Sequence, residues 1–200
     1  MRFLRLYLRS RRVPLALVTA TAVIAVTWAL CRAYANSPTA NAQTVSLAVM
    51  LAVVAFGTTL GGFDEDLDRA ASARWPIRRA VHLLLTAAVI VALLFLTTFT
   101  EARFEPLTLV LRNTAGLLGL TALGAALVGV ARAWIAPLVW TLVAVLPVLG
   151  PSTKPGVQVV AWLVQPVGTT VAGVCAAVLA AGGLAAYALH GCPRQPDPIR

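Results

Sequence analysis

Long apolar stretches alternate with short polar segments along the chain. A helix that crosses the ~30 Å hydrocarbon core of a bilayer needs roughly 20 predominantly apolar residues, within a range of about 17 to 25. Six stretches meet this requirement: 13–33, 44–63, 80–100, 113–131, 134–150 and 167–189. Because lipid offers no partners to backbone polar groups, each stretch is predicted to be a helix. The pattern therefore predicts an all-α membrane protein, a six-span transmembrane helical bundle that forms a single domain over residues 1–200.

Composition places the chain in a bilayer and not in water. Of its 200 residues, 60% are hydrophobic and 12% are charged, and the mean hydropathy is +0.86. A water-soluble domain of this composition would expose large apolar surfaces. The formal net charge of +9 would indicate nucleic-acid binding in a soluble protein, but here the arginines cluster between apolar stretches, as they do beside membrane helices. We interpret the charge as a signal for orientation, with membrane lipid and not nucleic acid as the partner.

Positive charge is distributed unequally between the two sides of the predicted bundle. One side receives both chain ends, the segment 64–79 and Arg132, which together carry most of the arginines. The other side receives Arg32, Arg103, Arg112 and Lys154. Cytoplasmic segments carry the excess of Lys and Arg, so both termini are predicted to be cytoplasmic. The abundance of Ala, Val and Arg is typical of GC-rich bacterial genomes and indicates a bacterial source. Together with the predicted spans, this indicates a multi-pass protein of the bacterial cytoplasmic membrane.

The segment before the first span is strongly basic. Its residues Arg2, Arg5, Arg9 and Arg12 are spaced three or four apart, which places them on one face of a helix. This spacing predicts either a short amphipathic helix in the membrane interface or an unstructured tail that only sets orientation. A signal peptide cleaved near 33–35 is a third interpretation. Because the apolar run is longer than the usual h-region, we expect the segment to be kept as a span.

Small residues recur at helical spacing within three of the predicted spans. They are Gly57 and Gly61 in the second span, Thr121, Ala125 and Gly129 in the fourth, and Gly182 with Ala186 in the sixth. Small side chains let helix backbones approach closely in a membrane. These stripes predict a compact bundle and carry no functional assignment.

The predicted spans lack the groups that several classes of membrane protein need. No Asp, Glu, Lys or Arg lies near the middle of a span, whereas ion-coupled transporters place ionisable groups at membrane depth. A phosphate-binding P-loop needs a Lys followed by Ser or Thr, but the only lysine, Lys154, precedes Pro155. His82, His190 and Cys192 have too few neighbouring ligands for a metal site. We expect no ATP hydrolysis by this chain, no metal and no cofactor.

The segment 64–79 is the densest polar part of the chain. Its acidic residues come first and its basic residues last, which favours a short helix because negative charge stabilises a helix N-terminus and positive charge a C-terminus. Pro76 is expected to end this helix before the third span begins. One interpretation is a plain solvated connector.

An enzymatic interpretation of the same segment takes Asp64, Asp66 and Asp68 as magnesium ligands that hold a diphosphate, as in membrane prenyl or phospholipid-headgroup transferases. Such enzymes use several carboxylates. The remaining ones in this chain, Glu101, Glu105 and Asp197, fall outside the predicted cytoplasmic loops or in the C-terminal tail, so a second aspartate set is missing.

The architecture and this segment together resemble the permease subunit of bacterial ATP-binding-cassette exporters of the drug and polysaccharide type. In that family the loop after the second span is a coupling helix, which opens with an acidic residue and closes with Pro, an aliphatic residue and Arg. The resemblance implies a dimer with a second copy or a paralogue, a separate cytoplasmic ATPase subunit, and export of a substrate. It assigns the ATPase contact to Asp64, Asp66, Asp68, Arg69, Trp75, Pro76, Ile77, Arg78 and Arg79.

The segment 155–166, between the fifth and sixth spans, is apolar but too short to cross the membrane. The resemblance implies a pair of short helices that dip into the outer leaflet and line the exit of the pathway. The alternative is an interfacial loop anchored by Trp162. The uncharged spans favour an apolar or amphipathic substrate.

Overall fold

The computed structural model describes residues 12–34, 37–61, 75–104, 106–146 and 150–193, with the side chain of Trp75 left out. This part of the chain forms helices and no strands, which confirms the prediction that the fold is all-α. The segments predicted as an amphipathic N-terminal helix (1–12) and as a cytoplasmic coupling helix (64–79) lie wholly or mostly outside the described residues.

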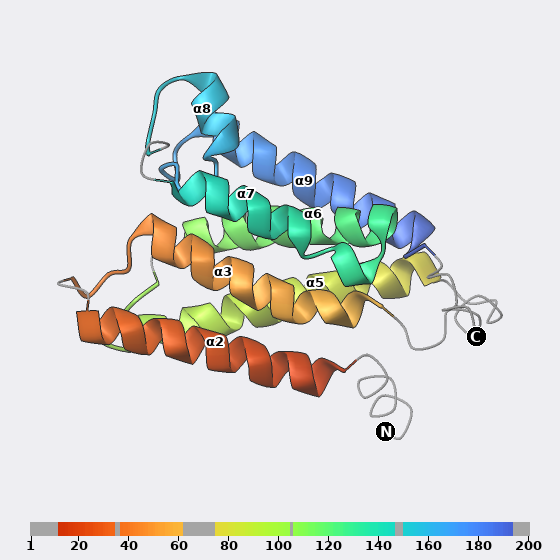
Figure 1. Cartoon of the computed structure of the whole chain (residues 1–200), viewed down its shortest axis with the longest axis horizontal. Helices are drawn as coiled ribbons and strands as arrows, with labels where there is room; N and C mark the ends of the chain where they lie inside the picture. The colour runs from red at the N-terminus through yellow and green to blue at the C-terminus, as the bar shows by residue number, and fades with distance from the viewer. Residues whose placement is uncertain (1–11, 35–36, 62–74, 105, 147–149, 194–200) are drawn as a thin grey trace.

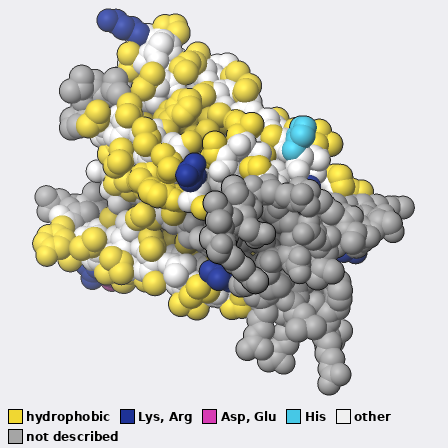
Figure 2. All heavy atoms as spheres, turned by 45° about the vertical axis from the view of Figure 1, so that its right-hand side comes forward, with side chains coloured by type: hydrophobic (Ala, Val, Ile, Leu, Met, Phe, Trp, Pro, Cys, Tyr) yellow, Lys and Arg dark blue, Asp and Glu magenta, His cyan; other side chains and the backbone are white. Residues whose placement is uncertain are grey.

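Among the described residues, five helices are long and apolar enough to cross a membrane, and the chain is therefore a multi-pass membrane protein. They are α2 (Val13–Tyr34), α3 (Ala42–Gly57, extended by the 3-10 turn η1, Thr58–Leu60), α5 (Trp75–Leu96, extended by η2, Thr97–Phe99), α6 (Leu107–Val128) and α9 (Thr170–His190). Many of their large apolar side chains point outward, as expected of surfaces in contact with lipid. On the face shown in Figure 2, hydrophobic side chains cover much of the described surface, and basic side chains appear as isolated spots.

Local sequence signals explain where several helices begin and end. Asn41 caps α3, because its side-chain oxygen accepts a hydrogen bond from Thr44 N at 2.8 Å. Gly129 (φ +88°) ends α6 and Gly191 (φ +68°) ends α9, both in backbone conformations that favour glycine.

The predicted span 134–150 forms a much shorter helix, α7 (Ile135–Val145), of 11 residues. It follows the 3-10 turn η3 (Val130–Arg132) and rises only about 16 Å. Its C-cap Leu146 has an extended ψ of 133°, as expected of a residue that precedes a proline. The next helix, α8 (Pro155–Val160), has 6 residues.

The helices run back and forth between two ends of the molecule (Figure 1). At one end, Tyr187 Oη at the end of α9 donates a hydrogen bond to Leu60 O in η1, at 2.8 Å, and the Arg79 guanidinium of α5 packs closely on Gly191. We call this the basic end, since its described charged residues are Arg12, Arg78, Arg79 and Arg132. The opposite end carries Arg32, Glu101, Arg103, Arg112 and Lys154, with an ion pair between Arg32 and Glu101.

The closest helix pair is α6 with α9, which touch through their backbones. A Cβ atom on Gly183 would lie 2.5 Å from the carbonyl carbon of Gly119, and one on Gly119 would lie 2.5 Å from Ala180 Cα. Both glycines are therefore required by the close approach.

The predicted small-residue stripes are partly right. Gly57 of α3 packs against Thr121 of α6, where an added Cβ would meet Thr121 Cγ2 at 3.2 Å, and Ala125 is fully buried. On α9, however, the stripe through Gly182 is wrong, because Gly182 is exposed with nothing near it and its neighbour Gly183 makes the contact.

This neighbouring pair supplies a matched test of the α6–α9 contact. We expect Gly183→Ala to lower the free energy of unfolding by about 1–3 kcal/mol, because the methyl group overlaps the backbone of α6. Gly182→Ala should leave stability unchanged or slightly raised, since Ala is the better helix former by about 1 kcal/mol. Thermal unfolding of the purified protein in detergent measures both. Equal effects of the two substitutions would contradict the contact.

Candidate functional site

Between α8 and α9 the chain turns back into the bundle instead of passing over its surface. Residues 161–165 form turns and not a helix, yet all five are buried, and Trp162 and Leu163 are fully inaccessible. We call this stretch the buried segment. The Trp162 ring lies on Gly116 of α6, where an added Cβ would meet its Cζ3 at 2.9 Å. The alternative of an ordinary interfacial loop is thereby wrong. The predicted pair of short helices is replaced by one short helix, α8, and a buried turn.

Non-helical backbone inside a membrane protein needs partners for its polar groups, because lipid supplies none. Leu163 O accepts hydrogen bonds from Ser46 Oγ of α3 at 3.1 Å and from Asn113 Nδ2 of α6 at 2.9 Å. Asn113 Nδ2 also donates to Ser46 Oγ at 3.0 Å, and both side chains are completely buried. Side chains of two helices, α3 and α6, thus hold the Leu163 carbonyl group at the same time.

Arg112 extends this arrangement toward the surface. Its Nη2 donates to Gln165 O at 2.9 Å and to Leu163 O at 3.3 Å, and its Nη1 donates to Pro166 O at 3.3 Å. A guanidinium is suited to this role because its rigid, planar donors can reach several carbonyl groups together. We call Ser46, Arg112, Asn113 and Gln165 the polar cluster.

Gln165 links the polar cluster to the loop that follows α7. Its Oε1 accepts from Ser152 N at 3.1 Å, and its Nε2 donates to Gly150 O at 3.4 Å. The side chain is 1% exposed, so its amide is satisfied inside the protein. The cluster therefore connects α3, α6, the buried segment and the 150–152 loop.

The chemistry open to the polar cluster is positioning and not bond breaking. Its members offer a fixed positive charge, amides and one hydroxyl, and no carboxylate or imidazole that would serve as a general base. No group of three or more His, Cys, Asp or Glu suited to a metal ion occurs among the described residues. At the other end of the bundle, Thr59 Oγ1 and His82 Nε2 form a buried hydrogen bond of 3.0 Å, which gives the imidazole ring a partner inside the protein.

The residues assigned to an ATPase contact lie at the basic end as far as they are described. Asp64, Asp66, Asp68 and Arg69 lie outside the described residues, as does the side chain of Trp75. Ile77 is 57% exposed, and Pro76 and Arg78 are also exposed. Arg79 is half-buried beside Gly191.

The connector helix that Pro76 is expected to end lies outside the described residues, but the third span begins earlier than residue 80. Helix α5 begins at Trp75, so Pro76 lies in its first turn, where the missing N–H of proline costs no hydrogen bond. Residues 76–79 are therefore continuous with the membrane-spanning helix. The proposed magnesium ligands Asp64, Asp66 and Asp68 precede this turn and lie outside the described residues.

Sequence reasoning missed the polar cluster. It placed the start of the fourth span at 113 and treated Arg112 as a flank outside the membrane, whereas α6 begins at Leu107 and includes both residues. The available signal was the adjacent pair Arg112 and Asn113 between two apolar runs, together with Gln165 just before Pro166.

Comparisons of this chain with protein-family models, with curated proteins and with solved structures find no match.

Two of the arginines at the opposite end, Arg112 and Arg103, provide a matched test of the polar cluster. Arg112→Gln should lower the free energy of unfolding by about 2–3 kcal/mol, because charge-assisted hydrogen bonds to buried carbonyls are lost. Arg103→Gln should change it little, since the exposed Arg103 side chain makes one long contact, 3.5 Å to Thr100 O. Thermal unfolding reports the stability.

Labelling of Val164→Cys in a cysteine-free background reports the position of the buried segment. We expect Val164→Cys to be protected from an impermeant maleimide with Arg112 present and reactive in Arg112→Gln. Protection that is unchanged by Arg112→Gln would show that the polar cluster does not hold the buried segment.

Proposed function

We propose that this chain is the membrane-spanning permease subunit of an ATP-driven exporter. The observation that supports this function most is the buried segment: between α7 and α9 the chain enters the bundle at the end opposite the basic end. In the proposed exporter this segment borders the pathway at one membrane face, and the hydrogen bonds of the polar cluster hold it in position. A second permease copy and a cytoplasmic ATPase complete the proposed assembly.

The proposal includes six crossings of the bacterial cytoplasmic membrane, with α7 as the fifth. Helix α7 starts near the basic end and runs toward α8, and α9 returns, so the direction alternates as six crossings require (Figure 1). Helix α7 covers about half of a ~30 Å hydrocarbon core. The buried segment, 161–165, would complete this crossing inside the protein, where irregular backbone is tolerated.

The proposed ATPase contact is the segment 64–79, whose last residues form the first turn of α5. Because 76–79 belong to the same helix as the span, a push at this turn moves α5 as a rigid rod. Arg79 packs on Gly191 at the end of α9, so α9 receives part of that movement. Exposed Ile77 and Arg78 supply an apolar and a charged contact, the combination that dominates many interfaces.

The orientation is tested by thiol labelling in a cysteine-free background. We expect an impermeant maleimide added outside intact cells to label Ser152→Cys and to miss Ser72→Cys until the membrane is opened. The reason is the excess of arginine at the basic end. Labelling of Ser72→Cys from outside, or of neither position, would refute the six-span orientation.

The ATPase contact is tested by co-purification. Trp75→Ala should weaken the association by about 2 kcal/mol, the cost of an interface anchor, and Arg78→Glu should weaken it further by reversing a charge. Lys154→Glu, an exposed charge reversal at the opposite end, is the control and should retain the ATPase.

Unchanged partner binding and transport in the Trp75→Ala, Arg78→Glu double variant would reduce the segment to a connector. A magnesium-dependent transferase activity that disappears in Asp66→Asn would instead support the enzymatic alternative.

A further inference from the structure

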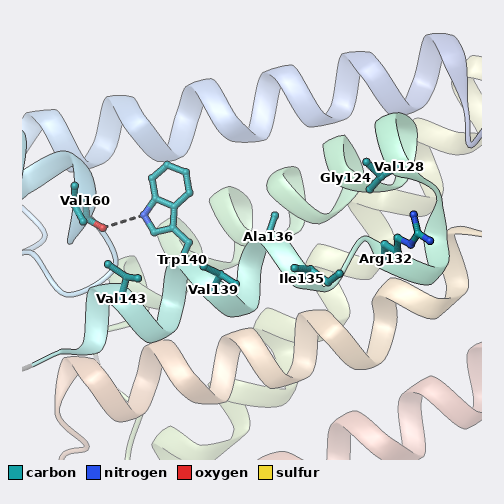
Figure 3. A pocket seen from close by; sticks show the side chains of 9 residues that line it. All are labelled: Gly124, Val128, Arg132, Ile135, Ala136, Val139, Trp140, Val143 and Val160. Atoms are coloured by element: carbon teal, nitrogen blue, oxygen red, sulfur yellow. Dashed lines mark hydrogen bonds between the residues drawn. The ribbon is translucent and has the colours of Figure 1, made fainter.

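An open apolar groove of about 630 Å³ runs along the outer side of α7. Figure 3 shows Arg132 and Val128 at one end of the groove and Trp140 and Val160 at the other. Its volume lies within the range of about 300–1,000 Å³ that ligand sites occupy. None of its lining residues belongs to the polar cluster or to the segment 64–79.

The walls of the groove suit a hydrocarbon chain. Ile135, Val139 and Val143 recur every four residues on α7 and are 43%, 53% and 37% exposed, so one face of the helix is both apolar and open. The polar atom of the Trp140 indole is already satisfied, because Nε1 donates to Val160 O at 2.9 Å. The Trp140 ring can thus border the groove without leaving its N–H group unpaired.

Arg132 gives the groove a charged end. It is the one charged residue in the lining, it is exposed, and its side chain makes no hydrogen bond or ion pair with the described residues. The part of the basic end that the structure describes contains no carboxylate. A guanidinium in this position is a suitable partner for a phosphate group, which it binds through two parallel hydrogen bonds.

The length of the groove matches one leaflet of a bilayer. From Arg132 to Val143 the chain advances about 16 Å at helical rise, and half of a ~30 Å hydrocarbon core is about 15 Å. A lipid with its headgroup at Arg132 would therefore extend its chain along the groove toward Trp140 and the bilayer centre. We propose that the groove along α7 binds one acyl chain of an anionic phospholipid, with the lipid phosphate at Arg132. This site requires only that the chain spans a membrane, and it stands independently of the proposed export function.

The binding is tested with the full chain in nanodiscs made of phosphatidylglycerol and phosphatidylcholine that carry the same acyl chains. Native mass spectrometry after release into detergent should show retained phosphatidylglycerol in preference to phosphatidylcholine. Arg132→Gln should reduce this preference about 5-fold, which corresponds to the ~1 kcal/mol that one arginine contributes near an anionic membrane surface. Arg12→Gln is the matched control, because Arg12 precedes α2, on the far side of α3 from α7 (Figure 1), and it should keep the preference.

A second variant tests the apolar part of the site. Ala136 lines the groove and is exposed, so Ala136→Phe places a ring in the groove without entering the core, and it should reduce retention of both lipids. An equal loss of preference in Arg132→Gln and Arg12→Gln would overturn the proposal, because binding would then follow net charge alone. Unchanged lipid retention in Ala136→Phe together with conversion of a dimer to monomers would also overturn it, since the groove would be a contact between copies.

Discussion

The whole arrangement depends on one constraint: inside a bilayer, every backbone polar group has to find its partner within the protein. Five long helices and α7 meet this requirement through their own hydrogen bonds. The buried segment cannot, because residues 161–165 are not helical. Its Leu163 carbonyl is therefore reached by side chains from α3 and α6, and Arg112 binds the carbonyls that follow. The position of the turn is set by the donors that neighbouring helices supply.

Helix α6 carries the contacts that make this possible. Gly119 lets its backbone meet α9, Gly116 leaves room for the Trp162 ring, and Thr121 faces Gly57 of α3. One turn earlier, Asn113 points into the polar cluster. Small residues thus provide close approach over most of α6, and its charged and amide side chains, Arg112 and Asn113, lie in its first two turns. Steric fit and hydrogen bonding act on different parts of the same helix, so neither has to be compromised for the other.

Hydropathy was sufficient to predict an all-helical membrane protein and its five long helices, because crossing a bilayer leaves a signal in length and composition alone. The boundaries were harder. A charged residue such as Arg112 looks like a flank until its buried carbonyl partners are known. The apolar run 134–150 conceals the end of α7 at Val145, for which Pro147 is the local signal. The choice between Gly182 and Gly183 was equally inaccessible, since small and apolar residues occur on every face of this alanine-rich helix. Long-range partners, such as Leu163 for Ser46, leave no local pattern.

For the proposed export cycle, the physical question is which contacts are able to differ between two states. The α6–α9 contact is a poor candidate, because its two backbones have no side chains between them that could rearrange. The polar cluster is a better one. Each of its hydrogen bonds contributes about 1 kcal/mol net, or roughly 1.5–3 where a charge takes part, so releasing a few costs an amount that a partner protein can supply. Movement of α9 through the Arg79–Gly191 contact would act on the buried segment that precedes it, while α6 holds the cluster's donors in place.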